Sequence, residues 1–291
     1  MAAGDFVKID LGCHIDGYIA VVAHTIIVGD DAATKVEGPR ADVLQGAYTA
    51  AQAALRMIRP GNTNEQVTAA LKKIAENYNV QPIVGTMMHN LKRFIIDGNK
   101  IIYVREEEGT ATTKPIKQEL VTFEANEVYA VDVAFSTGDG RPKEKDIRTT
   151  VFKRVADAKY MLKSASSRAF YGDLCKKFEF FPFSLRNFDD ERQAKMGIVE
   201  CRTHNLVQGY PVVAEKDGDH VAHFKFTVLV LPSGNSRVTG LELPANIDNT
   251  LFETLPEDVK AILAIEEGNK KKKKAAAKAA AGGEAPKTAA P

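Results

Sequence analysis

Apolar residues typical of strands, chiefly Val and Ile, fill two runs within residues 5–28. The pair Asp16-Gly17 stands between these runs, and it is typical of a two-residue hairpin turn. We therefore expect a β-hairpin over this stretch, with Ile15 paired to Tyr18 across the turn.

The apolar residues that follow recur at helical spacing. Residues 39–58 predict a helix, because Pro39 suits the first helical turn and Pro60-Gly61 ends the pattern. A second helix is expected directly afterwards, since Thr63 and Gln66 have the spacing of a capping box.

Four later segments extend the prediction to an α/β fold. Residues 101–120 are polar and mixed, which indicates a loop or an irregular hairpin. Residues 127–135 have strand character and are closed by a turn. Residues 160–210 are rich in charge and phenylalanine and predict helices, and residues 223–232 return to a strand. The sheet is thus expected to be interrupted by a helical insertion.

Composition and charge limit the classes of partner. Hydrophobic residues make up 44% and charged residues 26% of the 291, as is usual for globular proteins. The net charge is only +1, so attraction to nucleic acid must come from local clusters. Beyond residue 268 the composition narrows to Lys, Ala, Gly and Pro, which predicts a disordered tail containing the lysine block 270–274.

Cysteine usage and the N-terminal sequence favour a reducing compartment. Cys13, Cys175 and Cys201 are odd in number and far apart in sequence, so they suggest neither a disulfide framework nor a zinc knuckle. The N-terminus has no apolar region of a secretory signal, and no apolar run has the length of a membrane span.

The hairpin carries the first candidate chemistry. In the expected register Asp10 and Val21 are diagonal neighbours on one face. Two carboxylates at these positions could share a divalent cation, but valine has no lone pair to donate. A dinuclear metal site cannot be completed from this hairpin.

Four segments, in one order, resemble the metal-ligand segments of type II methionine aminopeptidases over residues 4–240. They are KIDLGCHIDGYIA with Asp10, TMMHNLKRFIIDGNK with His89, EVYAVDVAFSTGDG with Asp132, and VAHFKFTVLVLP with Lys225. The resemblance implies that these four residues and Val21 occupy vestigial metal-ligand positions. A second catalytic histidine of the enzymes is matched by Asp97.

The residues at these positions argue against hydrolysis. Asp10 and His89 are retained and Asp132 is a shortened carboxylate, whereas Val21 and Lys225 cannot bind a metal. An ammonium has three donors and no acceptor, so it repels a cation. We expect Lys225 to replace the metal electrostatically by pairing with both aspartates, and we expect no cofactor.

With these ligand losses, the segment MGIVEC and the C-terminal lysine run, the chain resembles the proliferation-associated, ErbB-binding protein family. The resemblance implies a non-catalytic pita-bread α/β fold with a helical insertion, and a chain that lacks an N-terminal portion of that fold. It implies fold segments at 1–158 and 213–267, an insertion at 159–212 and a tail at 268–291. Under-covered apolar residues are then expected on the hairpin, at Val7, Ile9 and Ile19.

The resemblance also implies binding to ribosomal RNA and the large ribosomal subunit, protein partners in growth signalling, and a location in the cytoplasm, nucleus and nucleolus. The residues expected to contact RNA are Lys159, Lys163, Arg168, Lys176, Lys177, Lys270, Lys271, Lys272, Lys273 and Lys274. Two alternatives stay open: a divergent metallo-aminopeptidase that removes N-terminal methionine, and a module that holds peptide termini without cleaving them.

Overall fold

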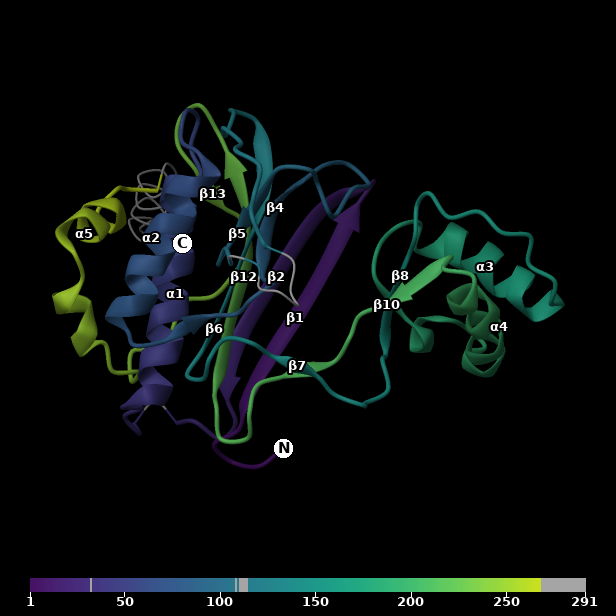
Figure 1. Cartoon of the computed structure of the whole chain (residues 1–291), viewed down its shortest axis with the longest axis horizontal. Coiled ribbons are helices and arrows are strands. Elements are labelled where there is room, and N and C mark those ends of the chain that lie inside the picture. Colours follow the sequence, from purple (N-terminus) through teal and green to yellow (C-terminus); the bar gives the residue numbers. More distant parts are fainter. Residues whose placement is uncertain (32, 108, 110–114, 268–291) are drawn as a thin grey trace, which may run out of the picture.

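A computed structural model describes residues 1–31, 33–107, 109 and 115–267. Its centre is a large sheet with helices on one side and a separate lobe on the other (Figure 1). The main strand order is β1-β2-β12-β6-β4-β5, with β13 added to β12 and β3 added to β6. The strands of this sheet are β1 (Phe6–Ile15), β2 (Tyr18–Ile27), β3 (Gln81–Pro82), β4 (Met87–Leu91), β5 (Ile101–Tyr103), β6 (Glu127–Ser136), β12 (Val221–Val230) and β13 (Ser236–Arg237).

The hairpin β1–β2 has the expected register, with Ile15 opposite Tyr18. Asp16 and Gly17 have φ angles of 50° and 82°, as a two-residue turn of this kind requires. A Cβ at Gly17 would lie 2.6 Å from the ring of Phe94, so this position needs glycine for space as well as for its φ angle.

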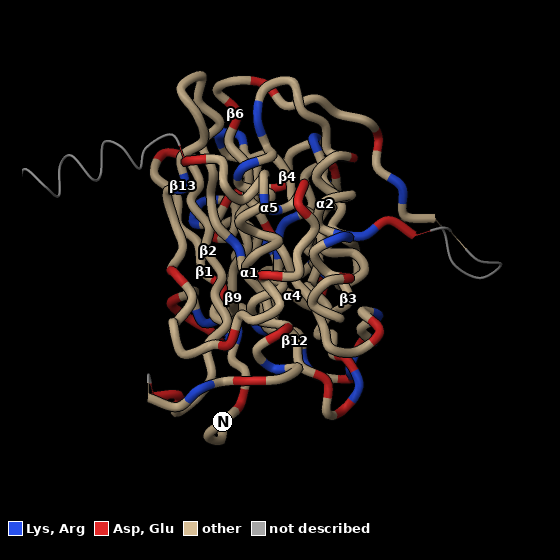
Figure 2. The backbone as a smooth tube through the Cα atoms, turned by 90° about the vertical axis from the view of Figure 1, so that its left-hand side faces the viewer, with Lys and Arg blue, Asp and Glu red and all other residues tan. Residues whose placement is uncertain are grey.

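Two predicted helices, α1 (Pro39–Met57) and α2 (Asn64–Asn77), lie on the face of the sheet opposite the separate lobe. Figure 2 views the molecule from the side of these helices. The Thr63–Gln66 capping box is present at the start of α2. Two further elements, the 3₁₀ turn η2 (Thr250–Thr254) and helix α5 (Glu257–Leu263), were not expected. Elements α1, α2 and α5 close the main hydrophobic core.

Strand β12 shows how the sheet separates the core from the site. Phe224 and Phe226 are buried in the core beneath the helices. Lys225, between them, faces the opposite side of the sheet, as the period of two along a strand demands.

Residues 151–210 fold into the lobe on the right of Figure 1, which we call the insertion. The expected helices are confirmed as α3 (Ala165–Lys177) and α4 (Glu191–Thr203), and a 3₁₀ turn η1 (Leu185–Asn187) lies between them. Three short strands that the sequence did not predict form a small sheet: β8 (Val151–Arg154), β9 (Phe183–Ser184) and β10 (Val207–Gly209). A second small sheet joins β7 (Lys143–Glu144) to β11 (Val213–Ala214).

The segment over residues 101–120, expected to be a loop or an irregular hairpin, contains a small amount of antiparallel pairing. It opens with the strand β5, and Glu107 forms an isolated bridge with Ile116 further on. The expected disordered tail lies outside the described residues. None of the helices in the described part of the chain has the length and apolar character of a membrane span.

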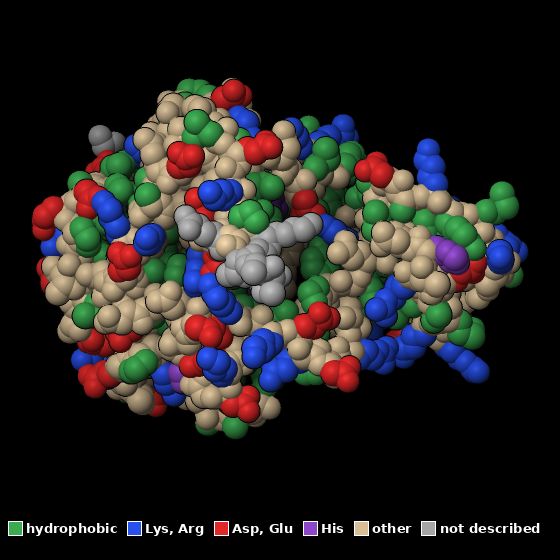
Figure 3. Space-filling view, viewed as in Figure 1, with side chains coloured by type: hydrophobic (Ala, Val, Ile, Leu, Met, Phe, Trp, Pro, Cys, Tyr) green, Lys and Arg blue, Asp and Glu red, His purple; other side chains and the backbone are tan. Residues whose placement is uncertain are grey.

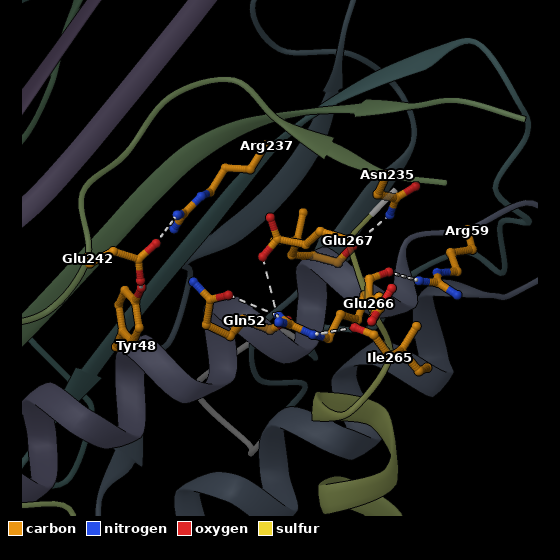
Figure 4. Close-up of polar contacts among 11 residues, drawn as sticks. Tyr48, Gln52, Arg59, Asn235, Arg237, Glu242, Ile265, Glu266 and Glu267 are labelled. Carbon is orange, nitrogen blue, oxygen red and sulfur yellow. Dashed lines mark hydrogen bonds and ion pairs between the residues drawn. The ribbon is translucent and has the colours of Figure 1, made fainter. Parts of the chain in front are cut away.

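Polar side chains fix the end of α1 to segments distant in sequence (Figure 4). The amide of Asn235 donates to the carbonyl oxygens of Leu55 and Ile58, each at 2.6 Å. Arg56 donates to the carbonyl oxygen of Ile265 at 3.0 Å and lies 3.6 Å from the carboxylate of Glu267. The two Asn235 contacts satisfy carbonyl groups that the C-terminus of α1 leaves without partners.

Candidate functional site

A groove of about 1590 Å³ lies between the sheet and the insertion. The hollow between the main body and the smaller lobe is visible in Figure 3. All five of the predicted vestigial positions line this groove: Asp10, Val21, His89, Asp132 and Lys225. The structure therefore brings together residues from strands β1, β2, β4, β6 and β12.

Lys225 lies between two carboxylates. Its Nζ is 2.8 Å from Oδ2 of Asp10 and 3.0 Å from Oδ2 of Asp132. Strand register explains the arrangement, because Lys225 is opposite Asp132 on one side and opposite Ala23 on the other. Ala23 is in turn opposite Asp10, and its small side chain lets Lys225 reach across β2. The expected pairing of Lys225 with both aspartates is confirmed.

The charges in this pair of contacts stabilise one another. Burial lowers the pKa of Lys225, but Asp132 and Asp10 outweigh burial, so the net shift is upward. Burial raises the pKa of Asp132, but a hydrogen bond from His223 and the charge of Lys225 outweigh it, so the net shift is downward. Both groups are therefore held in their charged forms.

His223 is a site residue that the sequence did not single out. Its Nε2 lies 2.7 Å from Oδ1 of Asp132, so both carboxylate oxygens of Asp132 are engaged. The signal that identifies it is its position two residues before Lys225, on the same face of β12.

Val21 and His89 complete the predicted set without joining these contacts. Val21 is 7% exposed and packs with Leu91 and Ala130 in a small apolar cluster. Nδ1 of His89 is buried and has no hydrogen-bond partner among the described residues. Burial lowers the pKa of His89 and favours its neutral form. Asp97 forms an ion pair with Lys153 from the insertion.

The divalent metal implied by the aminopeptidase resemblance does not fit these donors. One oxygen of each aspartate is occupied by the Lys225 ammonium, which would repel a cation. Within the described ranges, no group of three or more His, Cys, Asp or Glu residues is placed to hold a metal ion. A hydrolytic step through a metal-bound water has no support in this arrangement.

One wall of the groove is joined to the hairpin by aromatic contacts. The rings of His14 and Phe181 stack with their centroids 4.2 Å apart, and Phe94 lies 6.5 Å from Phe181. These contacts connect β1 to the insertion, and sequence reasoning did not identify them. Nothing in the local sequence of either segment signals them.

The predicted RNA-contacting residues within the described part lie on the surface of the insertion. Two of them already have protein partners, since Lys177 pairs with Asp189 and Arg168 donates to the carbonyl of Lys163. The lysine block 270–274 lies outside the described residues. The exposed set on the insertion is Lys159, Lys163, Arg168, Lys176 and Lys177.

The hairpin leaves apolar residues exposed, as expected in part. Ile9 is 45% exposed, whereas Val7 and Ile19 are half-buried. Leu11 and Ile15 are exposed as well, at 58% and 77%. Strand β1 lies at the edge of the sheet, whereas α1 packs mainly on β6 and β12, and α2 packs on β5 and β3.

Comparisons with known proteins place the chain in a family. Residues 1–154 match metallopeptidase family M24. Proliferation-associated protein A of Dictyostelium discoideum is 45% identical over 261 residues, covering 90% of this chain and 66% of that protein. ERBB-3 binding protein 1 of Solanum tuberosum is 43% identical over 268 residues, covering 92% of this chain and 66% of that protein.

The fold comparison agrees with the sequence. The solved structure of a thermophilic Arx1 matches with a TM-score of 0.78 at 27% identity, covering 91% of this chain and 75% of that one. The expected pita-bread α/β fold is confirmed. The chain spans 66% of the length of each of the two curated relatives. The chain belongs to metallopeptidase family M24, and the proliferation-associated, ErbB-binding proteins are its relatives within that family.

Proposed function

We propose that this protein acts by binding RNA at the large ribosomal subunit rather than by cleaving peptides. The observation that carries the non-catalytic part is the Lys225 ammonium between Asp10 and Asp132, where a peptidase of this fold would need a metal ion. The ribosomal part rests on the relatives in the ErbB-binding family. Roles in ribosome biogenesis, translation and growth regulation, protein partners in growth signalling, and a location in the cytoplasm, nucleus and nucleolus belong to the same proposal.

The charge distribution supports the RNA-binding part. Residues 151–210 contain eleven Lys and Arg against seven Asp and Glu, a net charge of +4. Residues 268–291 contribute a further +6. The remainder of the chain carries −9. Since phosphate binding depends on local basic charge, the insertion and the tail are the segments suited to contact RNA.

The test is co-sedimentation with purified large ribosomal subunits at moderate and raised salt. The whole chain is compared with a chain ending at residue 267 and with a Lys163→Glu/Lys176→Glu double variant. We expect each change to weaken binding, and each lost phosphate contact to reduce the log–log salt slope by about one.

The matched control is Lys72→Glu/Lys117→Glu, which changes the net charge equally but alters exposed lysines of the main body. This control should bind more tightly than the insertion variant. Equal losses in both would mean that only net charge matters. Well-folded protein that does not co-sediment at either salt concentration would refute the ribosomal proposal.

A second candidate function is a module that holds peptide termini without cleaving them. Two observations favour it: the size of the groove, and the buried Nδ1 of His89 without a partner among the described residues. Calorimetric titration with short unblocked peptides tests it. Binding without turnover that is lost on N-acetylation supports this function, and the absence of binding excludes it.

A further inference from the structure

Four acidic side chains gather at one end of the groove, where the chain enters β1 and β12. They are Asp5, Glu215, Asp217 and Asp219, and all of them line the groove. The two segments meet there, since the rings of Phe6 and His220 lie 5.0 Å apart. We call this region the acidic end of the groove.

Basic side chains do not neutralise this region. Lys216 points its ammonium to Asp139, which does not line the groove, at 3.0 Å. Lys8 also lines the groove, and the guanidinium of Arg40 lies 5.0 Å from the centre of the Phe6 ring. The four carboxyl groups therefore outnumber these three basic side chains.

Glu215 provides a second observation that points to a binding site at this end of the groove. It is 8% exposed, and its Oε1 has no hydrogen-bond partner among the described residues. Leaving a buried carboxyl oxygen without a donor costs free energy, and a donor supplied from outside would recover it. An ammonium or guanidinium group is the donor that a carboxylate binds most strongly.

We propose that the acidic end of the groove binds a basic segment of another polypeptide, with a lysine or arginine side chain donating to Oε1 of Glu215. Arginine is the better match, because its planar guanidinium can engage two carboxyl oxygens at once. The net charge of −9 on the main body would attract such a segment. This surface is distinct from the basic insertion proposed for RNA, so either proposal can fail without the other.

The probe is an N-acetylated, C-terminally labelled hexa-arginine peptide, and binding to the full chain is followed by fluorescence anisotropy. Acetylation removes the N-terminal amine, so capture of a peptide terminus cannot produce the signal. Glu215→Gln keeps the shape of the side chain and removes its charge. We expect it to weaken binding about tenfold or more, as for the loss of a hydrogen bond to a charged group.

The matched control is Glu76→Gln, an exposed residue of α2 on the opposite side of the sheet, which should change the Kd less than about twofold. If Glu215→Gln does not fold, the Asp217→Asn/Asp219→Asn variant decides, and a loss of several-fold is expected. Equal affinities of the groove and control variants would overturn the proposal, and so would absence of binding by the wild-type chain. Binding that appears only after removal of residues 268–291 would also overturn it, because the occupant would then be the chain's own lysine block.

Discussion

At the residue scale, the main feature of the site is that the ammonium of Lys225 occupies the position where this fold can hold a metal ion. Lys225 is 17% exposed and Asp132 is 15% exposed, so neither charge is well solvated by water. Their mutual attraction offsets part of the cost of burial, and His223 satisfies the second oxygen of Asp132. Removal of one partner should therefore cost more than the loss of an ordinary surface contact.

We predict that Lys225→Glu lowers stability in the absence of metal. The change places a third carboxylate beside Asp10 and Asp132 and should reduce the free energy of unfolding by about 3 kcal/mol. Thermal and urea denaturation in the presence of a chelator measure the effect. Lys216→Glu is the control, because its pair with Asp139 is exposed and its loss should scarcely move the melting temperature. An unchanged or raised melting temperature for Lys225→Glu would contradict the electrostatic role of Lys225.

We also predict that His89 makes stability depend on pH near neutrality. Burial lowers its pKa in the folded protein below the ordinary value of 6.5. The unfolded chain therefore binds more protons as the pH falls through 6.5, and stability should decrease from there downward. Melting temperatures of wild type and His89→Gln between pH 8 and pH 5 test this, and the variant should show the smaller decrease. His24 and His220, whose pKa values burial also lowers, should leave a residual dependence in the variant.

Residue identity predicted only part of this site. The pairing of Lys225 with Asp10 and Asp132 followed from the resemblance together with the chemistry of an ammonium. Oε1 of Glu215 has no hydrogen-bond partner among the described residues. The sequence could not predict this, because it results from the packing of residues next to β11 against distant strands.

At the element scale, the elements with strong local signals were predicted well. The hairpin followed from Asp16-Gly17, and α1 and α2 followed from their helical spacing, Pro39 and the Thr63 capping box. The strands β8 and β10 were missed because each has only three or four residues and is held by a partner about fifty residues away. Short strands of this kind depend on tertiary contacts rather than on their own propensity.

We predict that Asn235→Ala destabilises the junction between β13 and α1. Asn235 is 2% exposed and donates to the carbonyl oxygens of Leu55 and Ile58, so its loss leaves buried acceptors unsatisfied. The expected decrease in the free energy of unfolding is about 1–3 kcal/mol, measured by urea denaturation. Asn99→Ala, at an exposed position, is the control and should have little effect. Similar losses for both variants would contradict a capping role for Asn235.

At the scale of the whole molecule, the net charge of +1 conceals an uneven distribution of charge along the chain. The main body is acidic and carries the groove, while the insertion and the C-terminal residues are basic. This division allows two partners of opposite charge to bind at different surfaces. Composition alone did not predict it, because the basic residues of 151–210 form one surface lobe only after folding.

The central claim is that the chain binds and does not hydrolyse, and one titration tests it most directly. The purified 291-residue chain is titrated with Mn²⁺, Co²⁺ or Zn²⁺ by calorimetry, while release of methionine from a Met-Ala-Ser peptide is followed in parallel. We predict neither stoichiometric metal binding in the groove nor methionine release, since Lys225 occupies the position between Asp10 and Asp132. Binding of one metal ion per chain together with release of methionine would contradict this account. If Lys225→Met also changed the rate of that release, the protein would be identified as a divergent metallo-aminopeptidase.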